Sequence, residues 1–247
     1  MNPLISIIIT YYKKKDYIMK TLNSILNQSY KNYEIIFVYD DKNKKELDYI
    51  NKLLLRFKKK KIIFNKSNLG VAKSRNIAMK YAKGSYITFI DSDDIWKKDK
   101  LKKQLKFMSQ NSCSLSFTSY NVIDDRDKVI KEMKVSKDAT YDNLYWSNFI
   151  GLSTVMINKK YIPSKIHFPN LKTQEDFALW LSLLRKGFKL RHFSKNLSSW
   201  RKTKNSLSSN IVQKLKDAFR LYYIQENKNF IFSIYSVLVL SYNKLIK

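Results

Sequence analysis

The sequence has 247 residues, 44% of them apolar, which is enough to bury the core of one large domain. Its 48 Lys and Arg against 20 Asp and Glu give a formal net charge of +28, which favours anionic partners such as nucleotides, nucleic acid and lipid headgroups. A single cysteine, Cys113, excludes an internal disulfide, and with only His167 and His192 beside it there are too few ligands for a structural zinc site. Most of the charge is Lys spread along the chain, so charge alone selects no function.

Targeting and membrane signals are also weak. The first residues, Met1-Asn2-Pro3, run directly into a strand-like segment and lack the basic start and apolar stretch of a signal peptide, which predicts a cytoplasmic protein. The most apolar stretch, residues 230–240, is shorter than the roughly 18 to 20 apolar residues that span a bilayer. We expect it to lie on a surface rather than to cross a membrane.

Short apolar runs alternate with helical patterns in the first 109 residues. Helices are predicted where apolar residues recur at i, i+3, i+4 and i+7, and strands where β-branched residues run together. The predicted strands are 4–9, 34–38, 62–64 and 86–90, and the predicted helices are 17–27, 46–57, 71–82 and 98–108. This alternation indicates βαβ units, and therefore an α/β fold with a mostly parallel central sheet flanked by helices. Gly70 fits a tight entry to the third helix, and Gly84 fits a left-handed C-cap after it.

Beyond residue 110 the predicted elements are shorter. We expect strands at 114–119 and 153–157, an acidic turn at 124–127, and a helix from Glu175 to Gly187. Residues 211–247, which we call the tail, have the pattern of one or two amphipathic helices with a Lys- and Tyr-rich exterior.

The residues that follow the predicted strands are polar or acidic. In open α/β sheets ligands bind outside the carboxyl ends of parallel strands, where Thr10, Tyr12, Asp40 and the turn Asp91-Ser92-Asp93-Asp94 are expected. We call residues 91–94 the acidic turn. Three carboxylates this close together repel one another and usually need a cation. A hard divalent ion is commonly held by one or two carboxylates with substrate phosphates and water, which predicts a nucleotide diphosphate site here.

The acidic turn also has a simpler explanation. Asp94 could cap the following helix, with Asp91 and Asp93 as solvated loop residues, although the position at the end of a strand favours a ligand site. The chain has neither G-x-x-x-x-G-K-[ST] nor G-x-G-x-x-G, so no glycine-rich loop is available to hold phosphates. A metal and basic side chains would have to take that role.

Five segments in order resemble the family 2 inverting glycosyltransferases with the GT-A fold, of the bacterial cell-surface polysaccharide type. The resemblance covers roughly residues 4–210, and its segments are SIIITYY (6–12), DYIMKTLNSILNQSY (16–30), EIIFVYDD (34–41), NLGVAKSRNIAMKYAKGSYITFIDSDDIW (68–96) and QEDFALWLSLLRKG (174–187). It implies that residues 1–210 form one domain, with a nucleotide-sugar-binding half at 1–109 and an acceptor half at 110–210. It also implies transfer of one sugar from a UDP-sugar to a glycan or lipid-linked acceptor.

The resemblance assigns the donor site residue by residue. Thr10 and Tyr12 would frame the nucleobase, Asp40 would hydrogen-bond its edge, Arg75 would lie near the base or the diphosphate, and Asp91 would contact the ribose. Tyr39 stands where the family often has a first Asp, and Lys13 where it usually has Asn.

The same resemblance assigns the metal and the base. Asp93 would bind a divalent ion, Mn²⁺ or Mg²⁺, with Asp94 supporting it, and Asp176 of the pair Glu175-Asp176 would be the catalytic base. Glu175 would support Asp176. The simpler explanation for this pair is that acids in a first helical turn complement the helix dipole.

Other assignments are less specific. Arg201 and Lys204, after the catalytic helix, would neutralise phosphate in place of a His that some family members use there. Trp180 is either a core residue or a platform for a sugar ring. The tail is either a helix packed on the domain or one resting on an anionic membrane surface.

The sequence fits three other classes of protein less well. The charge and the 14% aromatic residues would suit a basic nucleic-acid-binding protein, but no such motif is visible and we expect no nucleic-acid partner. A phosphatase with an Asp nucleophile would carry D-x-D at its first strand, whereas here it follows the fourth. A sugar-nucleotide pyrophosphorylase would have a Gly- and Arg-rich loop after the first strand, where this chain has Thr10-Tyr11-Tyr12-Lys13. Q-x-x-R-W, the signature of processive polysaccharide synthases, is missing, so we expect one sugar to be added per encounter.

Overall fold

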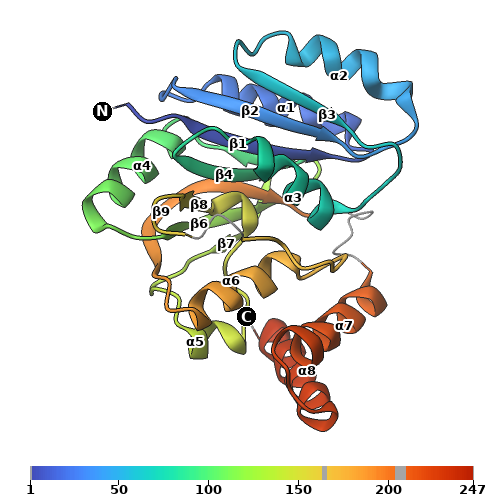
Figure 1. The fold of residues 1–247 in the computed structure, drawn as a ribbon, viewed down its shortest axis with the longest axis vertical. Helices are drawn as coiled ribbons and strands as arrows, with labels where there is room; N and C mark the ends of the chain where they lie inside the picture. The colour runs from blue at the N-terminus through green and yellow to red at the C-terminus, as the bar shows by residue number, and fades with distance from the viewer. Residues whose placement is uncertain (1, 163–165, 204–209, 247) are drawn as a thin grey trace.

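The computed structural model describes residues 2–162, 166–203 and 210–246 (Figure 1). Nine strands form one sheet in the order β3-β2-β1-β4-β8-β6-β9-β5, with β7 paired to β6. Helices cover both faces, with α3 in front of the sheet and α1 behind it in Figure 1. The α/β fold predicted from the sequence is confirmed.

The first half of the chain follows the predicted alternation. Its four strands run parallel to one another in the sheet. They are β1 (Ile5–Tyr11), β2 (Tyr33–Tyr39), β3 (Lys60–Phe64) and β4 (Tyr86–Asp91). The helices are α1 (Lys15–Leu26), α2 (Leu47–Leu54) after the short η1 (Lys44–Glu46), α3 (Val71–Tyr81) and α4 (Lys100–Asn111). Each lies within a few residues of its predicted range.

The core consists of two layers, one on each side of the sheet. Successive side chains of a strand point to opposite faces of the sheet. Ile7 and Ile9 of β1 belong to the layer with α1, α2 and α4, and Ile8 belongs to the layer with α3 and the helix at residues 175–185. All three isoleucines are buried. This two-sided burial explains why the strands are continuous apolar runs in the sequence.

The second half completes the sheet with shorter and more polar strands. They are β5 (Ile95–Trp96), β6 (Leu115–Ile123), β7 (Val129–Met133), β8 (Met156–Asn158) and β9 (Leu190–Arg201). The helices are α5 (Tyr141–Tyr145), η2 (Leu152–Thr154) and α6 (Glu175–Arg185). β8 runs antiparallel to β4 and β6, so the sheet is parallel in its first half and mixed in its second. Strands β5, β7 and β9 were not predicted.

Gly84 has a different role from the predicted one. Gly70 does enter α3 with φ +85, but Gly84 is not left-handed, and α3 ends at an extended Ala82 instead. A Cβ on Gly84 would lie 2.7 Å from the carbonyl oxygen of Leu4 and from the amide nitrogen of Ser6. Glycine is needed at this position because the backbone passes so close to β1.

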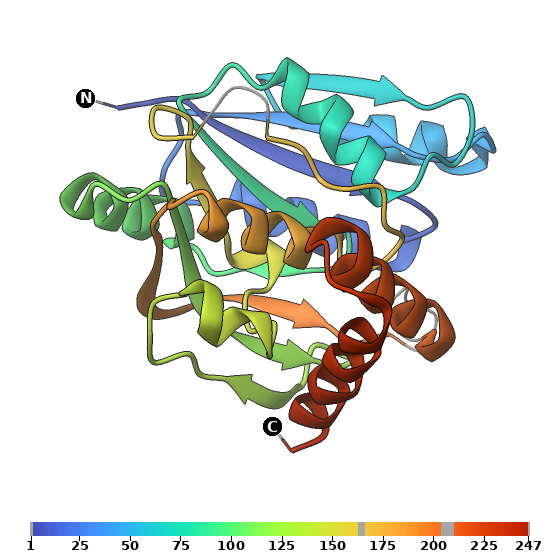
Figure 2. The same ribbon diagram turned by 60° about the horizontal axis from the view of Figure 1, so that its bottom comes forward.

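The tail forms α7 (Ile211–Arg220), the π-helical η4 (Leu221–Gln225) and α8 (Phe230–Leu245). Two buried acids attach it to the domain: Asp217 accepts hydrogen bonds from the amide and hydroxyl of Thr173, and Glu226 pairs with Arg185. Figures 1 and 2 show α7 and α8 side by side at the end of the molecule beyond α6. Within the described residues, no helix is both long and apolar enough to cross a bilayer. The division into 1–109, 110–210 and 211–247 stays a prediction.

Candidate active site

Three neighbouring strands bring the predicted donor residues to one edge of the sheet. Asp91 ends β4 directly beside Thr10 of β1, and Asp40 follows β2 on the other side of β1. Thr10 is half-buried, whereas Tyr12, just beyond the end of β1, is 41% exposed. The carboxyl ends of these strands therefore form a polar edge with an aromatic ring at its rim.

Asp40 is engaged by the loop that leads into α3. Its carboxylate accepts hydrogen bonds from the amides of Leu69 (2.8 Å) and Gly70 (2.9 Å) and from the side chain of Asn65 (2.8 Å). Asp40 is buried at 3% exposure. In this arrangement its carboxylate shapes the loop, and its contact with a nucleobase stays a prediction.

Arg75 of α3 connects the two acidic clusters. Its guanidinium forms an ion pair with Asp91 (2.7 Å), the first acid of the acidic turn, and another with Glu175, the first residue of α6. It also lies over the ring of Phe168, 5.4 Å from its centroid. Burial opposes a charge on Arg75, but the two carboxylates outweigh it and raise the pKa of Arg75. The acidic turn and the Glu175-Asp176 pair thus belong to one site.

Asp176 lies next to this bridge at the start of α6. Gln174, with φ +64, turns the chain into the helix, and the Asp176 carboxylate accepts a hydrogen bond from the Phe177 amide (2.7 Å). Burial, and then the charge of Glu175, raise the pKa of Asp176 to about 7, although Arg75 partly opposes this. A carboxylate with such a pKa can accept a proton near neutral pH.

Asp94 is a buried support of the acidic turn. Its carboxylate accepts hydrogen bonds from the Ser153 hydroxyl (2.5 Å) and from the Arg201 amide (2.9 Å), which ties the turn to η2 and β9. The helix-cap explanation for Asp94 is wrong, because α4 begins later, at Lys100, with Asp99 at its N-cap position.

Asp93 already faces a cation. The Lys14 ammonium lies 2.6 Å from its carboxylate and also donates to the Thr203 hydroxyl (3.2 Å). Burial raises the pKa of Asp93, and Lys14 opposes the shift. In the described part of the chain, no group of three or more His, Cys, Asp and Glu side chains is arranged to hold a metal ion. A divalent ion at Asp93, beside Asp91, would therefore fit only with further oxygens from donor phosphates and water.

Arg201 is buried and binds the backbone of the acidic turn. Its guanidinium donates to the backbone oxygens of Asp93 (2.9 Å) and Asp124 (2.6 Å), pairs with the carboxylate of Asp127, and lies over the ring of Tyr17 at 4.8 Å. These contacts occupy all three of its nitrogens, so phosphate neutralisation by Arg201 would require some of them to break. The other predicted phosphate ligand, Lys204, lies outside the described residues.

Trp180 lies in the core. It is fully buried and packs edge-on against Phe168, with ring centroids 6.3 Å apart. This geometry favours the core explanation over the sugar platform.

Three residues near the acids were not singled out from the sequence. Lys14 is hidden in the run Lys13-Lys14-Lys15, which has the pattern of a solvated surface. Ser153 lies in a segment that was predicted to be a strand. Tyr120 of β6 is close enough to the acids that, after burial itself, the charges of Asp176 and Asp94 raise the pKa of its phenol to about 12. The lysine run follows the first strand closely, but nothing in the sequence distinguishes Lys14 from Lys13 and Lys15.

The sequence matches the family Glycosyl transferase family 2 over residues 6–166, which is more than half of the chain. The chain therefore belongs to this family and is a glycosyltransferase, as the five segments predicted.

Particular relatives extend this likeness over most of the chain. It is 37% identical to TuaG of Bacillus subtilis strain 168, a glycosyltransferase assigned to teichuronic acid biosynthesis, over 90% of this chain and 88% of TuaG. WfaP of Escherichia coli, whose name is UDP-Glc:alpha-D-GlcNAc-diphosphoundecaprenol beta-1,3-glucosyltransferase, is 37% identical over 86% of this chain and 82% of WfaP. A solved structure of the mannosyltransferase PcManGT from Pyrobaculum calidifontis, with GDP-Man and Mn²⁺, superimposes with a TM-score of 0.71, covering 98% of this chain and 74% of that chain at 12% identity. The last likeness supports the GT-A fold.

Proposed function

We propose that this glycosyltransferase moves one sugar from a UDP-sugar to a hydroxyl of a lipid-linked glycan in bacterial surface polysaccharide assembly. The observation that carries the proposal is the Arg75 bridge, which joins Asp91 of the acidic turn to Glu175, next to Asp176. The names of two relatives support the substrates: WfaP uses a UDP-Glc donor and a diphosphoundecaprenol-linked acceptor, and TuaG is assigned to teichuronic acid biosynthesis.

The donor would bind across the carboxyl ends of β2, β1 and β4. Tyr12, exposed at the rim, would stack on the nucleobase, with Thr10 and the loop held by Asp40 on either side. Asp91 would accept a hydrogen bond from a ribose hydroxyl while Arg75 holds its other side. This assignment keeps the roles that the family resemblance gives to these residues.

Asp176 would act as the general base. It would accept the proton of the acceptor hydroxyl while that oxygen forms a bond to the anomeric carbon and the bond from this carbon to the diphosphate breaks. UDP then leaves with the electron pair, and the anomeric configuration inverts in a single displacement. A divalent cation at Asp93 would supply charge stabilisation for the departing diphosphate.

Lys14 would have two partners in this cycle. Without donor its ammonium neutralises Asp93, 2.6 Å away. With donor and metal present, Asp93 would face the metal and Lys14 would be free to contact a phosphate oxygen, since the charges of the two cations repel each other. Lys14 would then bind phosphate, as the backbone amides of a glycine-rich loop do in other nucleotide-binding folds.

A donor screen tests this function. UDP-, GDP- and CMP-linked sugars are added to the protein with Mn²⁺, and the melting temperature is recorded, because a ligand that binds the folded state raises it. We expect UDP-sugars to give the largest rise, and UDP to be released when a polyprenyl-diphosphate-linked sugar is added. No rise with any nucleotide sugar, together with a rise on adding RNA or DNA, would instead favour the nucleic-acid-binding alternative.

A further inference from the structure

Helix α8 buries polar side chains and exposes apolar ones. Its fully buried residues include Ser233 and Ser236, whereas large apolar side chains point to solvent. Ile231 is 80% exposed and Leu245 is 85% exposed. A helix on the surface of a globular protein normally buries its apolar stripe and exposes its polar one.

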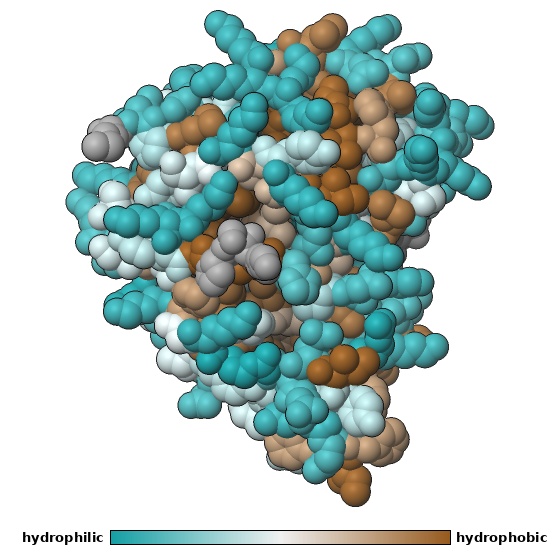
Figure 3. Space-filling view, viewed as in Figure 1, coloured by the Kyte–Doolittle hydropathy of each residue, from teal (hydrophilic) through white to brown (hydrophobic). Residues whose placement is uncertain are grey.

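The exposed residues form a continuous face. They follow helical spacing along the whole of α8, and we call them the outer face: Ile231, Ile234, Tyr235, Leu238, Tyr242 and Leu245. Figure 3 shows apolar surface at the lower end of the molecule, where Figure 1 places the tail. An apolar face of this extent on a single helix indicates a surface that is covered in the working protein.

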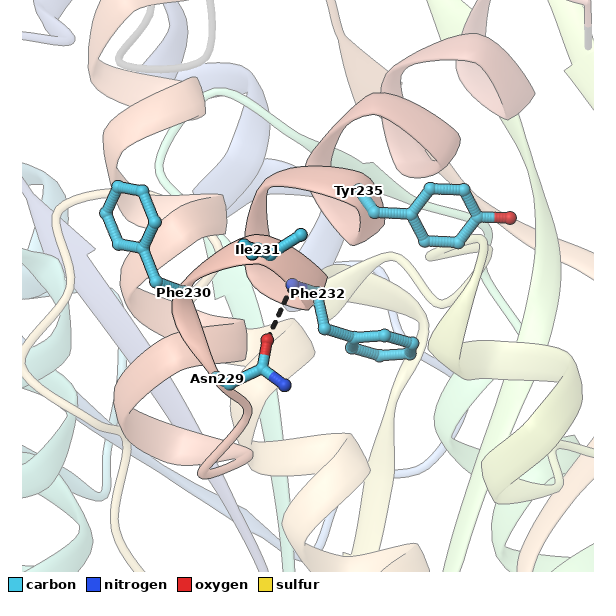
Figure 4. Close-up of a pocket in the computed structure, with 5 residues that line it drawn as sticks. All are labelled: Asn229, Phe230, Ile231, Phe232 and Tyr235. Carbon is cyan, nitrogen blue, oxygen red and sulfur yellow. Dashed lines mark hydrogen bonds between the residues drawn. The ribbon is translucent and has the colours of Figure 1, made fainter.

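The start of α8 adds a hollow to this face. Phe230, Ile231, Phe232 and Tyr235 line a shallow apolar hollow that is largely open to solvent (Figure 4). The Asn229 side chain accepts a hydrogen bond from the Phe232 amide (2.8 Å) and so caps the helix beneath it. The hollow therefore lies at a capped helix start.

The charges beside the outer face have one sign. The tail contains six Lys and Arg and two acids, Asp217 and Glu226. Both acids are buried and paired, Asp217 with Arg220 and Glu226 with Arg185. The exposed charge of the tail is consequently positive, with Lys244 in the last turn of α8 and the half-buried Lys228 just before the helix.

We propose that the outer face of α8 docks on an anionic lipid bilayer, with the tail lying in the plane of the interface. Apolar side chains would enter the acyl boundary while the lysines contact anionic headgroups, the arrangement of an interfacial amphipathic helix. A second copy of the chain fits less well, because pairing two tails would bring together positive faces of two molecules that each carry a net charge of +28.

Docking would also serve the proposed function, on which this part of the argument rests. A lipid-linked acceptor keeps its reacting sugar close to the membrane surface. α7 and α8 adjoin α6, the helix that begins with Glu175 and Asp176, as Figure 2 shows. Docking through the tail would hold the base within reach of that layer.

Vesicle flotation of the full chain tests the proposal. The vesicles contain phosphatidylcholine alone or with phosphatidylglycerol, and no acceptor, so the result does not depend on transfer activity. We expect binding to the anionic vesicles, weakened as salt increases. The double variant Ile231→Ser with Leu238→Ser should lower the partition coefficient about tenfold or more. Leu55→Ser, a change of an equally exposed leucine at the end of α2, should not alter it.

Two outcomes would overturn the proposal. One is equal flotation of the wild type and the double variant, which would mean that the outer face does not touch lipid. The other is a concentration-dependent dimer in light scattering that the double variant abolishes while flotation stays absent, which would assign the face to a second copy. Unchanged thermal unfolding and donor binding of the variant verify that its fold and its site are intact.

Discussion

At the scale of single residues, the site is a set of acids whose charges are balanced from different elements. Asp91 and Glu175 share Arg75, and Asp93 faces Lys14, but Asp176 has no ion pair of its own among the described residues. Burial and the charge of Glu175 therefore act on Asp176 with only partial compensation, which explains its raised pKa. Within the same described ranges Asp94 also lacks an ion pair, but its carboxylate is held by the Ser153 hydroxyl and the Arg201 amide. Asp176, which the family resemblance names as the base, accepts only the hydrogen bond from the Phe177 amide in that part of the chain.

The raised pKa of Asp176 has a consequence for stability. Its folded-state pKa of about 7 exceeds the ordinary value, so the folded protein binds a proton more tightly than the unfolded chain. The contribution of Asp176 to stability is therefore fully present below about pH 4 and is lost as the pH rises through about 7. Asp176→Asn should melt at a higher temperature than wild type at pH 8 and at about the same temperature at pH 4.

Asp142→Asn is the matched control for that comparison. Asp142 is an exposed acid in the first turn of α5, and so tests what a helix-dipole acid contributes. It should change the free energy of unfolding by less than about 0.5 kcal/mol at either pH. If Asp176→Asn lowered the melting temperature at pH 8, the raised pKa would be contradicted.

Lys14 gives a prediction about the metal. Removing its ammonium leaves Asp93 as an unbalanced carboxylate, so a divalent ion should bind there more tightly in Lys14→Met, on the order of tenfold. Calorimetric titration of Mn²⁺ without nucleotide measures the change, because Lys14 would contact a phosphate once a donor is bound. Lys15→Met, at the neighbouring exposed position, is the control. Weaker Mn²⁺ binding in Lys14→Met would show that Lys14 and the metal do not compete for Asp93.

At the scale of elements, the site is where α3, β4 and α6 meet. Arg75 joins them although its partners are 16 and 100 residues away in the sequence. The loop before α3 is shaped by Asp40, and the turn after β4 is tied to η2 and β9 through Asp94. Each element thus holds another by a charged side chain, because the edge of the sheet offers little apolar surface there.

Arg75→Gln would test this junction. It leaves Asp91 and Glu175 close together without their cation, and should reduce the free energy of unfolding by about 3 to 5 kcal/mol in urea. Arg191→Gln, which removes an exposed ion pair with Asp138, should cost no more than about 1 kcal/mol. Arg75→Lys can pair with one acid at a time and should fall between them. Equal effects of Arg75→Gln and Arg191→Gln would contradict a junction role.

The sequence predicted the elements whose pattern is strong. Strands β1, β2 and β4 are mostly apolar on both faces, and glycine at Gly70 marks the start of α3, so their order and the acids after them could be predicted. β9 could not be, because LRHFSKNLSSWR mixes polar and apolar residues without a period of two. The bridge through Arg75 and the Lys14–Asp93 pair depend on tertiary contacts that no local pattern contains.

At the scale of the whole molecule, the sheet edge that carries the acidic turn and the tail have different surfaces. The sheet edge collects acids within a chain of net charge +28, and the tail exposes apolar residues among lysines. The general positive field would attract both an anionic nucleotide sugar and an anionic membrane. Because the field is screened by salt, donor binding should weaken when the ionic strength is raised from about 0.05 to 0.5 M.

The central claim is that the acidic turn and Asp176 form one active site in which Asp176 is the base. Asp176→Asn measures it most directly, with donor affinity by calorimetry and transfer of radiolabelled sugar to a polyprenyl-diphosphate-linked acceptor followed in parallel. We predict a dissociation constant within about threefold of wild type and a transfer rate lower by about 10² to 10⁴, with Asp142→Asn unchanged in both. Transfer by Asp176→Asn at the wild-type rate would contradict the assignment.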